Sequence, residues 1–390
     1  MEPANPKPAN ASLGSPGIDP KPVRPTLAWR LEQTRNRPSG FDYMRVLLAF
    51  AVIGWHSLLI SYGEAGTNGP WGRTLEPFAL LIVPMFFALS GFLVAGSLER
   101  SRSLVGFVGL RVFRIMPALS VEVLLSALVL GPVLTTDSFA SYVSDPTFHH
   151  YFWNILGDIH YLLPGLFKTN PTDLVNGQLW TVPYELVCYV LLSVLMVTGI
   201  VHRRAWLLLF LGLCYAAQLA NTVFRDQTEF HGAGGSSIVM AFVTGVLFFR
   251  YRERIPWSRG LFLAALVFSL ALPMYIPKGM RFAALPIAYV TVCLGLLNPP
   301  RNRFMLSGDY SYGLYLYGFP VQQAVYTVFP AFHSWYFNLL LAIPLTALIA
   351  TGSWWLVERP ILRHRTMLNL FEDWYLARFW GIATRTPRKI

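Results

Sequence analysis

The chain has 390 residues, of which 54% are hydrophobic and only 13% charged, and its formal net charge is +11. With a mean hydropathy of +0.46, it is too apolar for a soluble domain of this length. The composition therefore excludes an ordinary soluble enzyme and indicates an all-α, polytopic membrane protein.

Ten apolar runs are candidates for transmembrane helices, which need about 17 to 25 residues each. They lie near residues 41–62, 75–97, 113–134, 178–199, 205–223, 236–251, 260–276, 282–298, 311–330 and 335–357. We therefore predict a helical bundle of about ten spans. An even number of spans places both termini on the same side of the membrane.

The basic residues indicate which side that is. Every Lys and Arg except Arg73, Lys168, Arg225, Lys278 and Arg281 falls in a terminus or in a loop on the same side as the termini. The positive-inside rule makes this side the cytoplasm. Because these loops face anionic lipid headgroups, the net charge requires no nucleic-acid partner.

The two ends of the chain differ from the apolar part. Residues 1–40 are rich in Pro, Asn and Ser, and we predict a disordered cytoplasmic tail. Residues 41–360 form the predicted transmembrane domain. Residues 361–390 alternate basic with apolar and aromatic residues, which predicts an amphipathic helix on the inner membrane surface, with a short frayed tail as the alternative.

The first apolar run contains His56 and begins with Arg45, eleven residues earlier. On an α-helix this spacing is close to three full turns and a rise of about 16 Å, so both side chains face the same way. An ionisable group in hydrocarbon costs about 2.5 to 3.5 kcal/mol and usually serves a function. A snorkelling Arg45 and a hydrogen-bonded packing role for His56 are the structural alternative.

Arg111 and Arg114 begin the third run at positions i and i+3, so their guanidinium groups share one helical face. Two such groups are well matched to phosphate oxygens, although a cytoplasmic anchor is the alternative. In the second run, Ser90 and Gly91 are small residues that allow close approach of helix backbones.

The fourth run places Glu185 in the first helical turn, where the helix dipole favours an acid. Its depth suggests a second role. If the helix begins near Gln178, Glu185 lies about 10 Å and His56 about 14 Å below the outer edge of the membrane. A contact between them would fix the tautomer of the imidazole ring.

Aromatic residues near the outer boundary are candidates for stacking on a sugar ring. They are Trp153 in the long outer loop (135–177), and Trp180 and Tyr184 at the start of the fourth run. Anchoring at the membrane–water boundary is the commoner role for such residues. In the ninth run, Tyr312 belongs to a dense set of hydroxyl groups that need protein or water partners. The His and Cys residues form no recognisable ligand spacing, so we predict no metal site.

Six short patterns occur together in a fixed order. They are Phe-Asp-x-x-Arg-x10-His (Phe41 to His56), Phe-Phe-x-Leu-Ser-Gly-Phe (Phe86 to Phe92), Arg-x-x-Arg-Ile-x-Pro (Arg111 to Pro117), Leu-Trp-Thr-x-x-Tyr-Glu (Leu179 to Glu185), Ser-Tyr-Gly-x-Tyr-Leu (Ser311 to Leu316) and Val-Glu-Arg-Pro (Val357 to Pro360). From about residue 41 to 365, the chain resembles the bacterial integral-membrane acyltransferase family 3, whose members O-acylate cell-surface sugars.

The resemblance implies that His56 is catalytic and that Arg45, Arg111 and Arg114 hold an acyl-coenzyme A donor, a co-substrate rather than a bound cofactor. We add Glu185 to the catalytic group. Ser90 and Tyr312 are further candidates for the donor site.

The sequence departs from the family in two respects. Many relatives carry a His near the end of the Ser-Tyr pattern, where this chain has Gly318. Some relatives have a fused extracytoplasmic domain, and here the chain stops at Ile390. We therefore expect the membrane part, alone or with a separate protein, to complete the transfer.

The resulting hypothesis is an O-acyltransferase, specifically an O-acetyltransferase, of the bacterial cytoplasmic (inner) membrane. It would move an acyl group from acyl-coenzyme A to a hydroxyl of a surface or exported glycan, or of a lipid-linked sugar. His56 would act either as a general base or as a transient carrier of the acyl group. The sequence leaves this choice and the oligomeric state open.

Two other functions are consistent with buried ionisable residues. One is a transporter or flippase of a lipid-linked saccharide, with His56, Glu122 and Glu185 along its path. Such a protein would show two related halves, and no such symmetry is visible in the sequence. The other is a catalytically silent partner in a glycan-assembly complex.

Overall fold

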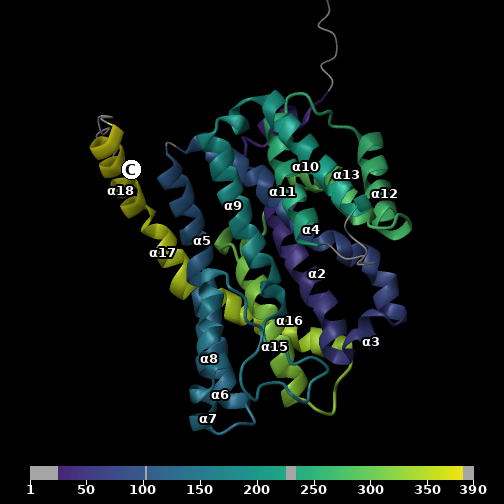
Figure 1. Cartoon of the computed structure of the whole chain (residues 1–390), viewed down its shortest axis with the longest axis vertical. Coiled ribbons are helices and arrows are strands. Elements are labelled where there is room, and N and C mark those ends of the chain that lie inside the picture. Colours follow the sequence, from purple (N-terminus) through teal and green to yellow (C-terminus); the bar gives the residue numbers. More distant parts are fainter. Residues whose placement is uncertain (1–24, 102, 225–233, 381–390) are drawn as a thin grey trace, which may run out of the picture.

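The computed structural model describes residues 25–101, 103–224 and 234–380, which form helices and no β-strand (Figure 1). The prediction of an all-α fold is therefore confirmed for these residues. The α-helices are α1 Leu27–Gln33, α2 Gly40–Tyr62, α3 Glu64–Thr67, α4 Pro70–Arg100, α5 Leu104–Leu125, α6 Gly131–Leu134, α7 Phe139–Ser144, α8 Pro146–Tyr151, α9 Val182–Val197, α10 Arg204–Phe224, α11 Gly235–Arg250, α12 Arg259–Tyr275, α13 Ala284–Gly295, α14 Arg303–Ser307, α15 Ser311–Val328, α16 Trp335–Ser353, α17 Arg359–Arg363 and α18 Arg365–Trp380.

Six shorter helical segments join or extend these. Two are π-helical, η1 Ser126–Leu130 and η6 Trp354–Glu358. Four are 3₁₀-helical, η2 Phe152–Leu156, η3 Gly177–Thr181, η4 Ile200–His202 and η5 Gly279–Phe282. A single turn of π-helix within an α-helix often accompanies a functional site.

Six helical stretches among the described residues are long and apolar enough to cross a membrane. They are Gly40–Tyr62, Pro70–Arg100, Leu104–Leu134, Gly177–Val197, Arg204–Thr222 and Trp335–Arg378. They correspond to the first five predicted spans and the tenth. A multi-pass membrane protein is the architecture that these stretches indicate.

Helices also occur at the other four predicted positions, but they are shorter or more polar. α11, α12 and α13 have 16, 17 and 12 residues, so they rise only about 24, 26 and 18 Å, less than a hydrocarbon core of about 30 Å. α15 has 18 residues and carries several hydroxyl and amide groups. The count of ten spans therefore stays a prediction.

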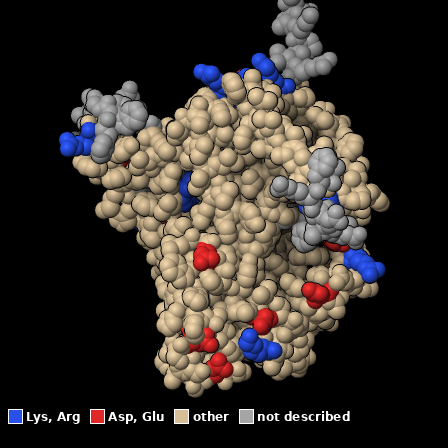
Figure 2. All heavy atoms as spheres, viewed as in Figure 1, with Lys and Arg blue, Asp and Glu red and all other residues tan. Residues whose placement is uncertain are grey.

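The charged groups divide along the long axis of the molecule. On the face that Figure 2 draws, acidic side chains gather toward the lower part, and most basic side chains lie toward the upper end. The C-terminal helix α18 lies at this upper end, whereas α7 and α8 of the long outer loop lie at the lower end (Figure 1). This polarity agrees with the distribution of basic residues along the sequence. The cytoplasmic location of both termini stays a prediction.

The N-terminal prediction is wrong for residues 25–40, which are ordered. Thr26 caps α1, because its hydroxyl accepts a hydrogen bond from the Trp29 amide at 3.2 Å. The Leu27 and Ala28 amides donate to the Ile255 and Arg252 carbonyls at 3.1 and 2.8 Å, and the Leu27 side chain is fully buried. These hydrogen bonds and the buried Leu27 side chain hold residues 25–40 against the bundle, although the polar composition of the segment did not predict such packing. Residues 1–24 lie outside the described part of the chain.

At the other end, α18 packs along α5. Ser103 donates a hydrogen bond of 2.5 Å to Glu372, which is buried, as is Leu376. In contrast, Met367, Leu370 and Trp374 are exposed. An apolar face turned outward suits contact with lipid, so an amphipathic membrane-surface helix stays our prediction for this segment. Residues 381–390 lie outside the described chain.

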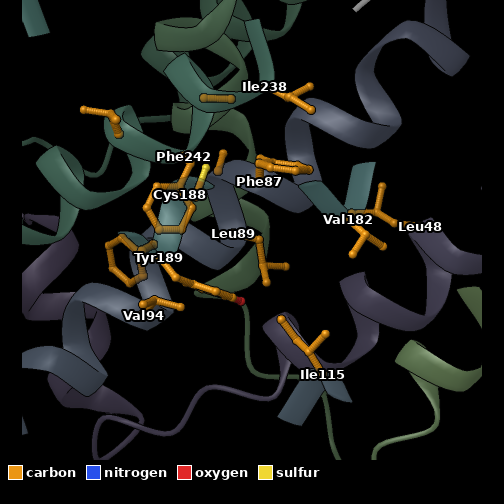
Figure 3. Packing of buried hydrophobic residues seen from close by; sticks show 14 of the residues in the cluster. Leu48, Phe87, Leu89, Val94, Ile115, Val182, Cys188, Tyr189, Ile238 and Phe242 are labelled. Atoms are coloured by element: carbon orange, nitrogen blue, oxygen red, sulfur yellow. The ribbon is translucent and has the colours of Figure 1, made fainter. Parts of the chain in front are cut away.

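The core of the bundle is formed by α4 packed against α11. A Cβ on Gly91 would lie 2.0 Å from the Phe242 carbonyl oxygen, and one on Gly245 would lie 2.2 Å from the Ala88 carbonyl oxygen. The two backbones are therefore in direct contact, which only glycine permits. Figure 3 shows side chains of α2, α4, α5, α9 and α11 converging here, with Tyr189 beside Phe242 at a ring-centroid distance of 6.3 Å.

Candidate functional site

The candidate active site begins with a cavity of about 340 Å³ between α2, α4, α5, α9 and α15. All five residues assigned from the sequence to the donor site line it, namely Arg45, Ser90, Arg111, Arg114 and Tyr312. Glu185 lines it too. Its apolar wall includes Leu89, Val94, Ile115 and Tyr189, which come from three helices (Figure 3). We call this space the donor cavity.

Two of its arginines are joined by one carboxylate. Asp309, just before α15, accepts hydrogen bonds from Arg45 at 3.2 Å and from Arg114 at 2.9 Å. Burial alone would raise the pKa of Asp309, but the two guanidinium groups hold it well below its usual range. Arg114 also lies 3.7 Å from Glu358, which ends the π-helix η6. These ion pairs fasten α2, α5 and α15 together at the cavity.

Arg111 has different surroundings. It donates a hydrogen bond of 3.1 Å to Ser97, and its guanidinium lies 6.0 Å from the Tyr189 ring centroid and 5.8 Å from that of Phe107. No ion pair that the described residues form includes Arg111. Its charge is thus the best placed of the three to meet an anionic ligand.

Glu185 lies in the donor cavity and does not pair with the imidazole. Tyr189 donates a hydrogen bond of 2.6 Å to Glu185 from one turn further along α9. No hydrogen bond or ion pair among the described residues joins Glu185 to His56, so the predicted contact is wrong. The physical reason is the rotation of α9 about its own axis. Glu185 lies on the same face of α9 as Tyr189, which is turned toward Arg111, and the depth of Glu185 in the membrane does not specify that rotation.

His56 lines a second, smaller cavity of about 300 Å³, which we call the imidazole cavity. Trp55, Gln178 and Trp180 contribute to its wall. The edge of the imidazole ring meets Phe319 at a centroid distance of 5.0 Å and an angle of 76°. Within the described chain no hydrogen bond to the ring is formed, which leaves its nitrogen atoms available for a substrate.

The two cavities adjoin along α4 and share two lining residues. Ala79, Leu80 and Ile82 line the imidazole cavity, Val83 lines both, and the donor cavity continues to Ser97 and Arg100. From Val83 to Arg100 the helix rises about 26 Å. Tyr315 is the second residue that both cavities share. A long ligand held at the arginines could therefore extend along α4 toward His56.

The three acceptor candidates are not equally placed. Trp180 lines the imidazole cavity. Tyr184 packs against Trp180 at 6.0 Å but lines neither cavity. Trp153, in η2, is 51% exposed and also lies outside both cavities. Only Trp180 thus adjoins His56.

Glu122, which the sequence offers as part of a transporter path, lies in a hydrogen-bond network away from both cavities. It is fully buried and accepts hydrogen bonds from Ser126 at 2.8 Å and from Asn176 at 2.6 Å. Asn176 also contacts Tyr151 of α8. This network ties the outer loop to α5, and no ion pair of the described residues includes Glu122.

Sequence reasoning missed Asp309, Glu358, Tyr189 and Tyr315 as members of the site. Asp309 adjoins the Ser-Tyr pattern, and Glu358 lies within the Val-Glu-Arg-Pro pattern. Paired arginines within an apolar bundle need carboxylate partners, so this rule signals that such partners exist. It does not identify them among the acids of the chain.

Comparison with known proteins identifies the family of the chain. The acyltransferase domain family matches residues 39–358. A protein of Shigella phage Sf6 named O-acetyl transferase is 26% identical over 351 residues, covering 84% of this chain and 97% of the relative. Nodulation protein 10 of Rhizobium leguminosarum bv. viciae is 27% identical over 371 residues, covering 86% of this chain and 96% of the relative. No solved structure matches. Because the family match spans most of the chain and includes both cavities, the protein belongs to the acyltransferase domain family and is an enzyme that transfers acyl groups.

Proposed function

We propose that this enzyme is an O-acyltransferase, specifically an O-acetyltransferase, that takes its acyl group from acyl-coenzyme A and delivers it to a hydroxyl of a surface or exported glycan. The single observation that carries the proposal is that two adjoining cavities share lining residues. One is lined by arginines and the other by His56, and both include residues of α4.

The donor cavity supports the choice of acyl-coenzyme A. Guanidinium groups bind phosphate oxygens in pairs of parallel hydrogen bonds. Arg111 is free of carboxylate partners among the described residues, and Arg100 adds a further positive charge to the wall. The phosphates would bind near these arginines at the cytosolic end, with the pantetheine arm extended along the apolar wall toward Val83.

The imidazole cavity supports transfer to a hydroxyl. A neutral imidazole takes the proton of an attacking hydroxyl, and this general-base step contributes about 10²- to 10⁴-fold to the rate. His56 faces Phe319 rather than a carboxylate, which favours the neutral ring. A transient acyl-imidazole is the other route that this position allows. Trp180 offers an aromatic face to the sugar acceptor.

The relative from phage Sf6, named O-acetyl transferase, supports oxygen as the acceptor atom and acetyl as the group transferred. We further propose the bacterial cytoplasmic (inner) membrane as the location, because the acyl donor is cytosolic and the chain is apolar. A transporter has no comparable support, since the family match identifies an acyltransferase.

Release of free coenzyme A by the purified protein tests the proposal. We expect release from acetyl-coenzyme A to require a glycan acceptor, with acetyl esters appearing on that glycan by mass spectrometry. Trapping labelled acetyl on the protein before acceptor is added would support the acyl-imidazole, and its absence would favour direct transfer. A protein that binds neither acetyl-coenzyme A nor longer acyl thioesters would contradict the proposal.

A further inference from the structure

The two cavities adjoin at a place that we call the neck, defined by the residues that line both. Val83 and Tyr315 are the residues common to both linings. The reacting carbon of the donor must lie near this neck, because the donor arm approaches from one side and His56 from the other. The Val83 side chain cannot form hydrogen bonds. The hydroxyl of Tyr315 is therefore the polar side-chain group of the two residues that line both cavities.

The hydrogen bonds of Tyr315 place its hydroxyl at the boundary. It donates to the Gln178 carbonyl oxygen at 2.7 Å and lies 2.6 Å from the Thr181 hydroxyl. Gln178 lines the imidazole cavity, and Thr181 lines the donor cavity. The ring of Tyr315 packs edge-on against Phe86 at a centroid distance of 6.0 Å. The ring is therefore held in place, and its hydroxyl lies between one residue of each lining.

We propose that the Tyr315 hydroxyl donates a hydrogen bond to the carbonyl oxygen of the acyl thioester and stabilises the oxyanion that forms during transfer. This assignment rests on the proposed function. As the acceptor oxygen bonds to the carbonyl carbon, His56 takes the hydroxyl proton, and the carbonyl electron pair moves onto oxygen. Collapse re-forms the carbonyl and breaks the carbon–sulfur bond. The departing thiolate takes the proton from the imidazolium, so free coenzyme A and an ester result.

The hydroxyl needs only a small movement to do this. Rotation about its carbon–oxygen bond turns the proton from the Gln178 carbonyl toward the neck, without moving the ring. The Thr181 hydroxyl lies 3.5 Å from that same carbonyl and can replace the lost hydrogen bond. Because the phenol oxygen does not move, only its proton must turn before charge develops on the acyl oxygen.

Tyr315→Phe tests the proposal by removing the hydroxyl and keeping the ring. Loss of one oxyanion donor typically lowers kcat by about 10²- to 10³-fold, and we expect that loss with a rise in donor KM of no more than about 10-fold. Tyr317→Phe is the matched control. Tyr317 lies on the same helix, is buried, and donates to Ser353 outside both cavities, so kcat should stay within about 3-fold.

A second variant separates the loss of the Tyr315 hydroxyl from the loss of a hydrogen bond that holds this hydroxyl in position. Thr181→Val removes a hydrogen-bond partner of Tyr315 and leaves its hydroxyl in place, so kcat should fall far less than in Tyr315→Phe. Equal losses in the two variants, or a Tyr315→Phe enzyme as fast as the parent, would overturn the proposal. If the parent itself transfers no acyl group, the proposed function fails instead, so the two failures are distinguishable.

A binding measurement keeps the test independent of turnover. S-acetonyl-coenzyme A retains a carbonyl but cannot transfer an acyl group, and S-propyl-coenzyme A lacks the carbonyl. One neutral hydrogen bond is worth about 2- to 10-fold in affinity, so the parent should prefer the ketone by that factor and Tyr315→Phe should lose the preference. An unchanged preference in the variant counts against the assignment.

Discussion

Asp309 accepts a hydrogen bond of 2.9 Å from Arg114, although the two residues lie 195 positions apart in the chain. The same carboxylate oxygen binds Arg45 at 3.2 Å. Three helices thus meet at one anion, whose two arginine partners line the donor cavity. Arg45 and Arg114 share the single negative charge of Asp309, whereas Arg111 has no carboxylate partner among the described residues, so Arg111 should provide most of the attraction for a phosphate. The roles of the three arginines therefore differ.

Asp309→Asn should destabilise the bundle. The substitution removes the anion and leaves two guanidinium groups facing each other. Because the side chain is 34% exposed, we expect a loss of about 1 to 3 kcal/mol in the free energy of unfolding, less than for a fully buried pair. Thermal unfolding in detergent measures this. Asp42→Asn is the control, since Asp42 pairs with Arg301 at an exposed site, and should cost under about 1 kcal/mol.

The Asp309 interaction also predicts a pH dependence. The pKa of this carboxyl is lower in the folded protein than in the unfolded chain, so the ion pairs add stability above the unfolded value of about 3.9. This contribution is lost as the pH falls from there through the folded pKa. The difference in unfolding temperature between the parent and Asp309→Asn should be constant from pH 7 to 5 and shrink on further acidification. A difference that grows in acid would contradict the ion-pair assignment.

His56→Ala should abolish transfer without loss of protein. The ring borders a cavity and makes no hydrogen bond within the described chain, so its removal leaves no buried partner unsatisfied. We expect a rate at least about 100-fold lower, as for loss of a general base, with expression and unfolding temperature near those of the parent. His160→Ala, in the outer loop beside Asp158, is the control. If His56→Ala acylates a glycan at the parent's rate, the imidazole is not catalytic.

Arg111→Ala should chiefly weaken donor binding. Loss of a charged hydrogen bond costs about 1.5 to 3 kcal/mol, or roughly a 10- to 100-fold increase in donor KM. Stability should change little, because Arg111 contacts Ser97 and aromatic rings rather than a carboxylate. Arg204→Ala removes an exposed pair with Glu253 and serves as the control. An unchanged donor KM in Arg111→Ala would remove this residue from the donor site.

Gly91→Ala should separate α4 from α11. The added methyl group would meet the Phe242 backbone, and overpacking of this kind costs about 1 to 3 kcal/mol. Because Ser90 and Phe242 both line the donor cavity, donor KM should rise as well. Gly212→Ala places the same group in open space on α10 and should leave stability unchanged or raise it by about 0.5 to 1 kcal/mol. Equal stability of the two variants would contradict the close helix contact.

Local patterns in the sequence were sufficient to predict several features of the protein. Mean hydropathy and run length identified a helical membrane protein, because a helix in lipid satisfies its own backbone hydrogen bonds. Helical periodicity placed Arg111 and Arg114 on one face, and the structure has both on the donor cavity. These properties depend on residues within a few turns of one another, so the sequence contains all the information they require.

Other features depend on how distant helices rotate and pack, and only the tertiary structure decided them. Depth in the membrane was compatible with a contact between Glu185 and His56, but the rotation of α9 turned Glu185 into the other cavity. Nothing near Arg114 in the chain identifies Asp309 as its partner, and nothing near His56 identifies Tyr315 as the residue at the neck. Such contacts are selected by side-chain packing between helices, which a linear pattern of hydrophobic and polar residues does not encode.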